Sequence, residues 1–207
     1  MGRSLKAAAV SGIGGPILFA VVLISLSFLQ NDFMRTLGWD PLTAPTRDWP
    51  SGLALGPWGF VMTATFMACG LLLVFFAFGM RQAFRAAPAG STASNLLTLS
   101  GFAMSFLAFS TDPTNRASPA TLHGRIHDGA FVVLGVTLLA SLVAFGFVFR
   151  GEKSWRANAV LSWVTATLIV PSFTIKGITF YFFLVGFLAW CETAAFKLWR
   201  RGIRDES

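Results

Sequence analysis

The chain has 207 residues, of which 55% are apolar and 12% are charged, and its mean hydropathy is +0.67. A soluble domain of this length cannot bury so much apolar surface, so the composition excludes a soluble protein and predicts an all-α integral membrane protein with one domain, residues 1–207. The net charge of +7 comes from short basic clusters between apolar runs, a distribution that argues against nucleic-acid binding.

Six apolar segments are predicted to cross the membrane as helices. They cover residues 11–29, 55–80, 93–110, 129–149, 156–173 and 178–198. The longest polar connection, residues 30–52, contains three prolines that exclude a regular helix, and its Trp39 and Trp49 are expected at the membrane interface. The fourth helix is expected to begin with Ser118 as its N-cap and Pro119 at its first position.

An even number of spans places both termini on one side of the membrane. Eleven of the sixteen Lys and Arg residues fall on the side of the termini, and five fall on the opposite side. The positive-inside rule therefore predicts cytoplasmic N- and C-termini. Pro171 is expected to kink or end the fifth helix.

A short polar stretch, residues 110–128, interrupts the apolar sequence on the predicted outer side. It holds both histidines of the chain, His123 and His127, together with Asp112 and Asp128. Ionisable groups between membrane spans often mark a functional site, so these residues are the first candidates for chemistry.

Three segments of the chain resemble the motifs of a bacterial and archaeal membrane-protein family known as domain of unknown function 998. They are residues 51–60 (Ser-Gly-Leu-Ala-Leu-Gly-Pro-Trp-Gly-Phe), Thr111-Asp112-Pro113, and His123-Gly-Arg-Ile-His127-Asp128. The resemblance spans roughly residues 10–200. It implies a six-helix fold in a bacterial plasma membrane, marks Asp112, His123 and His127 as the characteristic polar positions, and supplies no activity.

Chemistry leaves three interpretations of these three residues open: a metal site, a hydrogen-bonded network, and direct binding of a ligand or lipid headgroup. Histidines four residues apart share a helix face, and with Asp112 they form a ligand set for a divalent metal of the zinc type, with a place for water. Such a site would make Asp112, His123 and His127 the catalytic residues of an intramembrane hydrolase acting at the outer leaflet. Alternatively, Asp112 accepts a hydrogen bond from a histidine or from Arg125, and the network fastens the third helix to the fourth.

Further expectations concern ligands and isolated polar groups. Arg116, Arg125 and Asp128 are candidates for binding the headgroup of a lipid or small amphiphile at the outer leaflet. Glu192, the acid inside the last span, suggests either an ion relay of a transporter or an ion pair with Lys197, Arg156 or Arg81.

The sequence therefore favours a multi-pass protein that binds an amphiphile or serves as an interaction subunit, with the hydrolase and a transporter as alternatives. Cys69 and Cys191 are expected at different membrane depths, too far apart for a disulfide.

Overall fold

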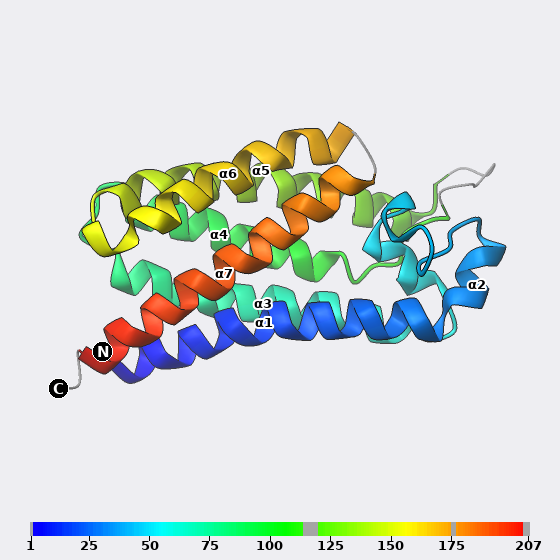
Figure 1. The fold of residues 1–207 in the computed structure, drawn as a ribbon, viewed down its shortest axis with the longest axis horizontal. Helices are drawn as coiled ribbons and strands as arrows, with labels where there is room; N and C mark the ends of the chain where they lie inside the picture. Colours follow the sequence, from blue (N-terminus) through cyan, green and yellow to red (C-terminus); the bar gives the residue numbers. More distant parts are fainter. Residues whose placement is uncertain (1, 114–119, 175–176, 205–207) are drawn as a thin grey trace.

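The computed structural model describes residues 2–113, 120–174 and 177–204, and every regular element in these ranges is helical (Figure 1). Six long helices form the body of the molecule: α1 (Gly2–Leu29), α3 (Gly59–Ala83), α4 (Gly90–Phe106), α5 (Leu122–Arg150), α6 (Arg156–Thr174) and α7 (Ile178–Arg204). Short elements join them: α2 (Asn31–Thr36) and the 3₁₀ helices η1 (Pro45–Arg47), η2 (Pro50–Leu55) and η3 (Lys153–Trp155).

The long helices run up and down, so that consecutive helices pack against one another and α1 lies between α3 and α7 (Figure 1). Both chain ends lie at one end of the bundle, which we call the terminal end. The segment with α2, η1 and η2 lies at the opposite end, which we call the loop end. The end of α4 and the start of α5 lie at this loop end as well, and with them the described candidate residues Asp112, His123 and His127 (Figure 1).

Four helices of the described chain, α1, α3, α5 and α7, are long and apolar enough to cross a membrane. Large apolar side chains also point outward from the surfaces of α4 and α6, for example Phe102 and Val164. A bundle whose outer surface is apolar on every long helix is suited to contact with lipid. The prediction of a helical membrane protein is confirmed to this extent.

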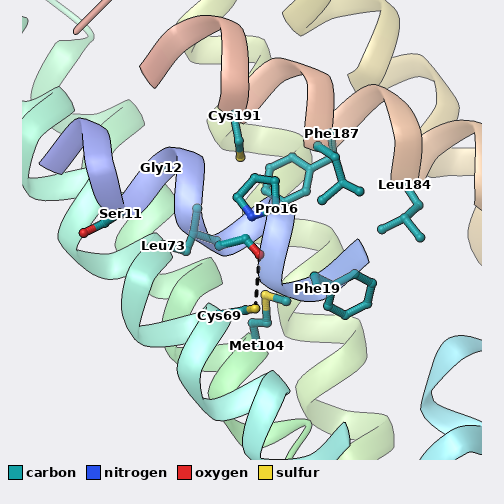
Figure 2. A pocket seen from close by; sticks show the side chains of 12 residues that line it. Ser11, Gly12, Pro16, Phe19, Cys69, Leu73, Met104, Leu184, Phe187 and Cys191 are labelled. Atoms are coloured by element: carbon teal, nitrogen blue, oxygen red, sulfur yellow. Dashed lines mark hydrogen bonds between the residues drawn. The ribbon is translucent and has the colours of Figure 1, made fainter. Parts of the chain in front are cut away.

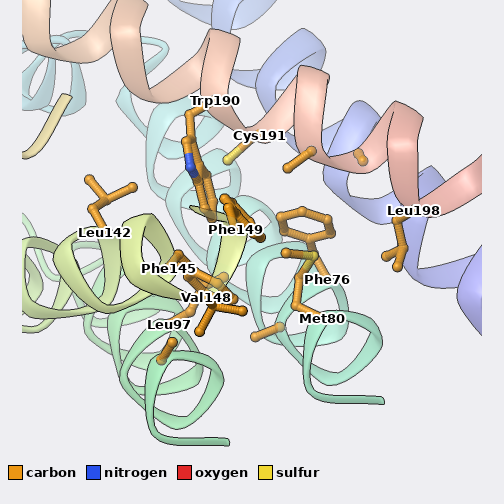
Figure 3. Packing of buried hydrophobic residues seen from close by; sticks show 14 of the residues in the cluster. Phe76, Met80, Leu97, Leu142, Phe145, Val148, Phe149, Trp190, Cys191 and Leu198 are labelled. Atoms are coloured by element: carbon orange, nitrogen blue, oxygen red, sulfur yellow. The ribbon is translucent and has the colours of Figure 1, made fainter. Parts of the chain in front are cut away.

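An aromatic cluster forms the core at the terminal half of the bundle. Phe76 from α3, Phe145 and Phe149 from α5, and Trp190 from α7 pack together there (Figure 3). Trp190 is fully buried, and its Nε1–H donates a hydrogen bond to Ser162 Oγ of α6 at 2.7 Å. This bond satisfies the polar atom of an otherwise apolar side chain in a region without water.

The connection at the loop end is more ordered than its prolines indicate, because it holds α2, η1 and η2. Trp39 was expected at the membrane interface, but it is only 3% exposed and its Nε1–H donates to the Ala44 carbonyl within the connection. The buried Gln30 side chain accepts from Trp58 N–H and donates to the Leu53 carbonyl, which fastens η2 to the end of α1. Main-chain hydrogen bonds, first that from Thr43, hold the pKa of Asp40 below its usual value.

The helix boundaries differ from the predicted ones most at the start of α1, which begins at Gly2 rather than at residue 11, and also at the start of α5. This helix begins at Leu122, with Thr121 rather than Ser118 as its N-cap, and Ser118 and Pro119 lie outside the described residues. Thr121 Oγ1 accepts a hydrogen bond from Gly124 N–H at 3.1 Å, as an N-cap side chain does. Pro171 lies inside α6, which ends three residues later.

Candidate functional site

Asp112 follows α4, and its carboxylate stabilises the start of α5. Its two oxygens accept hydrogen bonds from Thr121 N–H at 2.7 Å and from Thr121 Oγ1–H at 2.9 Å. Thr121 thus donates its hydroxyl proton to Asp112 and accepts from Gly124 N–H. A side chain at position 124 would collide with this arrangement, because a Cβ built on Gly124 lies 2.2 Å from Asp112 Oδ2.

His127 joins α5 to the end of α4. The ring is only 4% exposed, and its Nδ1 lies 2.8 Å from the Phe109 carbonyl oxygen and 3.1 Å from that of Leu107. Both partners are acceptors, so Nδ1 carries the proton and shares it between them. These carbonyls follow the last turn of α4, where the helix supplies no N–H partners. A second polar link between the two helices therefore runs through His127 to the main chain, beside the one from Asp112 to Thr121, whereas the network hypothesis had Asp112 accept from a histidine or Arg125.

The second ring nitrogen of His127, Nε2, supplies a hydrogen-bond acceptor to the site. With the proton on Nδ1, Nε2 carries a lone pair and accepts hydrogen bonds. Nε2 makes no hydrogen bond with any residue in the described parts of the chain. Phe66 packs against the imidazole in an edge-on contact, with ring centroids 6.3 Å apart, and this contact fixes the ring plane.

His123 lies four residues earlier on α5, in a different environment. Its side chain is exposed and lies beside the Phe109 ring, with centroids 5.9 Å apart. Among the described residues no three His, Cys, Asp or Glu side chains are grouped as metal ligands. The metal site of Asp112, His123 and His127, and the hydrolase built on it, stay predictions.

The three residues predicted to bind a headgroup differ in their positions relative to the cavity at the loop end. Asp128 is exposed and lines a cavity at the loop end. Arg125 is also exposed but does not line that cavity, and Arg116 lies outside the described residues. The structure thus brings Asp112, His127 and Asp128 to one cavity, and it leaves His123 and Arg125 outside its lining.

This cavity has a volume of about 480 Å³, within the range of pockets that hold small ligands, about 300–1,000 Å³. Much of its wall is aromatic, with rings from α1, α3, α5, α7 and the segment before η2: Phe19, Trp49, Phe66, Phe131 and Phe180. Trp49 contacts Phe131 and Phe180 edge-on, with centroids 5.2 Å and 4.8 Å apart. These contacts hold the loop end against α5 and α7 and close one side of the cavity.

The cavity collects residues from three distant segments of the chain. Ser51 comes from η2, Thr111 to Pro113 from the stretch after α4, and His127 and Asp128 from the first turns of α5. These are the segments whose motifs the chain shares with domain of unknown function 998. A model of the family described as protein of unknown function (DUF998) matches residues 13–197. The chain belongs to this family. No curated protein and no solved structure matches the chain.

The aromatic wall was not predicted from the sequence of this DUF998 protein. Trp49 was noticed only as an interfacial residue, and Phe131 and Phe180 were not separated from the other phenylalanines of the chain. Phe131 lies four residues after His127, on the same helix face, and this spacing was the available signal. Nothing local in the sequence connects Phe180 with α5, because their contact depends on how α7 packs.

Glu192, in α7, does not form the expected ion pair. Within the described ranges its carboxylate has no ion-pair partner, and Lys197 donates instead to the Ser154 carbonyl at 2.5 Å. Glu192 also lies far along α7 from the loop-end cavity, in the half of the helix nearer the chain terminus. It therefore belongs to a different part of the molecule from the candidate site.

Cys69 and Cys191 are both free and buried. They line the same small cavity, of about 50 Å³, between α1, α3 and α7, and Pro16 lies between them in the view of Figure 2. The Cys69 thiol donates to the Gly15 carbonyl at 3.4 Å. The space has little polar lining and is far smaller than the loop-end cavity, so it is a packing defect beside the proline.

Proposed function

We propose that this DUF998 protein is a six-span protein of a bacterial plasma membrane that holds a lipid or small amphiphile in the loop-end cavity. The observation that carries the proposal is the meeting of the three family motifs at one cavity with an aromatic wall and a polar end. A ligand with an apolar body and a polar head matches such a lining. The bacterial location rests on the resemblance to a bacterial and archaeal family.

The path of the chain supports six spans. α4 begins at the end of the bundle where α3 finishes, and it returns to the end where α5 starts (Figure 1). If α3 and α5 cross the bilayer, α4 traverses the same thickness, and the same reasoning applies to α6 between α5 and α7. The 17 residues of α4 are about 25 Å long, close to the hydrocarbon thickness of about 30 Å.

The distribution of charge supports cytoplasmic termini. The terminal end carries eleven of the sixteen basic residues, in the chain ends and in the connections after α3 and α5. The positive-inside rule places this end in the cytoplasm and the loop end at the outer leaflet. An amphiphile in the cavity would then enter from the outer leaflet or from the outer aqueous phase.

Filling the cavity tests the proposal. Val132 lines the cavity, and Val136 lies one turn further along α5, equally open to the surroundings but outside the lining. We expect purified wild-type protein and Val136→Trp to carry a bound amphiphile in native mass spectrometry, and Val132→Trp to carry far less. Equal occupancy in the two tryptophan variants, or a wild-type protein without any bound amphiphile, would show that the cavity is not the binding site.

A further inference from the structure

The polar end of the loop-end cavity offers hydrogen-bond acceptors to a ligand. The proton of His127 is used by the carbonyls of Leu107 and Phe109, so its Nε2 lone pair is what remains for a ligand. His127 lines the cavity, so a ligand or water there can supply the donor that Nε2 does not receive from the described residues. A headgroup that donates hydrogen bonds is therefore favoured over one that only accepts them.

Among the described residues, the charged side chains that line this end are acidic. Asp128 lines the cavity beside His127 and makes no hydrogen bond or ion pair with any residue that the structure describes. Asp112 contributes a second carboxylate to the same end. The described part of the lining contains no lysine or arginine, and Arg125, from the same turns of α5, is not part of it. An anionic headgroup would therefore meet like charges in a partly dehydrated space.

The aromatic wall also favours a positively charged headgroup. The ring faces of Trp, Tyr and Phe attract cations. Trp49, Phe131 and Phe66 line the cavity together with Asp128 and His127. The remaining wall, with Phe19, Leu107 and Val132, has no charge and suits an alkyl chain.

We infer, on the basis of the proposed amphiphile binding, that the ligand of this cavity carries a protonated amine whose N–H groups donate to His127 Nε2 and Asp128. The amine would lie against the aromatic wall, and its apolar chain would extend along Val132 toward the lipid-facing side of α5. A free alkylamine and a phospholipid with an ethanolamine headgroup share this chemistry. Quaternary ammonium, sulfate and phosphate headgroups lack the N–H donors, and the last two also carry the wrong charge.

The test uses the full-length protein in phosphatidylcholine nanodiscs and three photoreactive alkyl diazirines of equal chain length. Their headgroups are a primary ammonium, a trimethylammonium and a sulfate. After illumination, peptide mass spectrometry measures labelling of residues 127–132 and of the segment around Trp49. We expect the primary ammonium probe to label these residues about tenfold more than the sulfate probe, as one charge-assisted hydrogen bond would give. The trimethylammonium probe should fall between them.

Two matched variants test whether the preference for the primary ammonium probe arises in the cavity. Asp128→Asn should lower labelling by the ammonium probe severalfold, whereas Asp32→Asn, an exposed acid of α2 outside the lining, should leave it unchanged. Replacing phosphatidylcholine by phosphatidylethanolamine in the disc separates the two sources of the amine. A fall in labelling assigns the site to the lipid headgroup, and unchanged labelling assigns it to a free alkylamine.

This experiment distinguishes a failure of the amine inference from a failure of the proposed amphiphile binding. Equal labelling by all three probes, or strongest labelling by the sulfate or trimethylammonium probe, would overturn the amine inference while leaving amphiphile binding in place. Labelling of residues 127–132 no greater than that around Val136, for every probe, would overturn both. Equal effects of Asp128→Asn and Asp32→Asn would also contradict the amine inference.

Discussion

Replacing His127 with phenylalanine removes the N–H that the carbonyls of Leu107 and Phe109 share, while keeping a ring of similar shape against Phe66. A hydrogen bond between neutral groups contributes about 1 kcal/mol net, and acceptors left without a partner in a buried place cost about 1–3 kcal/mol. The new ring restores some apolar contact. We therefore expect His127→Phe to lower the free energy of unfolding by about 1–3 kcal/mol.

The neighbouring histidine supplies the control. His123 is exposed, and among the described residues it makes only a ring contact with Phe109, so His123→Phe should change the free energy of unfolding by less than about 0.5 kcal/mol. Denaturant titration of both variants in mixed micelles, followed by tryptophan fluorescence, measures the difference. Equal losses in the two variants would refute the reasoning, and equal losses that chelation of the wild type reproduces would favour the metal site of Asp112, His123 and His127.

Three further predictions concern close contacts in the bundle. Gly124→Ala should lower the free energy of unfolding by about 1–2 kcal/mol, because the new Cβ displaces Asp112 from the helix cap. Gly129→Ala has open space around its Cβ and should not lower it. A thermal melt that ranks the two variants the other way would contradict this. Gly12→Ala should destabilise the packing of α1, because its Cβ would lie 2.6 Å from Phe76 Cδ2, while Gly14→Ala meets nothing and should be neutral or slightly stabilising in the same melting assay. Cys69 and Cys191 should stay unlinked under oxidant in membranes and react with maleimide only after denaturation, and a cross-linked species on a non-reducing gel would show the packing around Pro16 to be wrong.

The long helices could be predicted from the sequence because hydrophobic runs report directly on membrane spans. α5 and α7 show this best, since their apolar lengths are bounded by the basic residues Arg150 and Lys197. The exact start of α5 was not predicted, because Ser118 was expected as the N-cap and the structure has Thr121 there. Thr121 caps the helix because the Asp112 carboxylate, from the segment after α4, accepts hydrogen bonds from both the N–H and the hydroxyl of Thr121.

The sequence predicted that Asp112 and His127 lie near one another, but not which groups they contact. Both residues line the loop-end cavity. The partners of His127, in contrast, are main-chain carbonyls at the end of α4, and every helix end offers such groups, so residue types alone do not identify them. The wall formed by Trp49 and Phe180 depends on tertiary packing between the segment before η2 and α7, which no local pattern specifies.

An experimental density map of the protein in lipid nanodiscs tests the central claim most directly, because it shows what the loop-end cavity holds. We expect an elongated density between Trp49, Phe131 and Val132, with its polar end within hydrogen-bond distance of His127 Nε2 and Asp128. A cavity closed by its own side chains, or filled only with separate water molecules, would contradict amphiphile binding at this site.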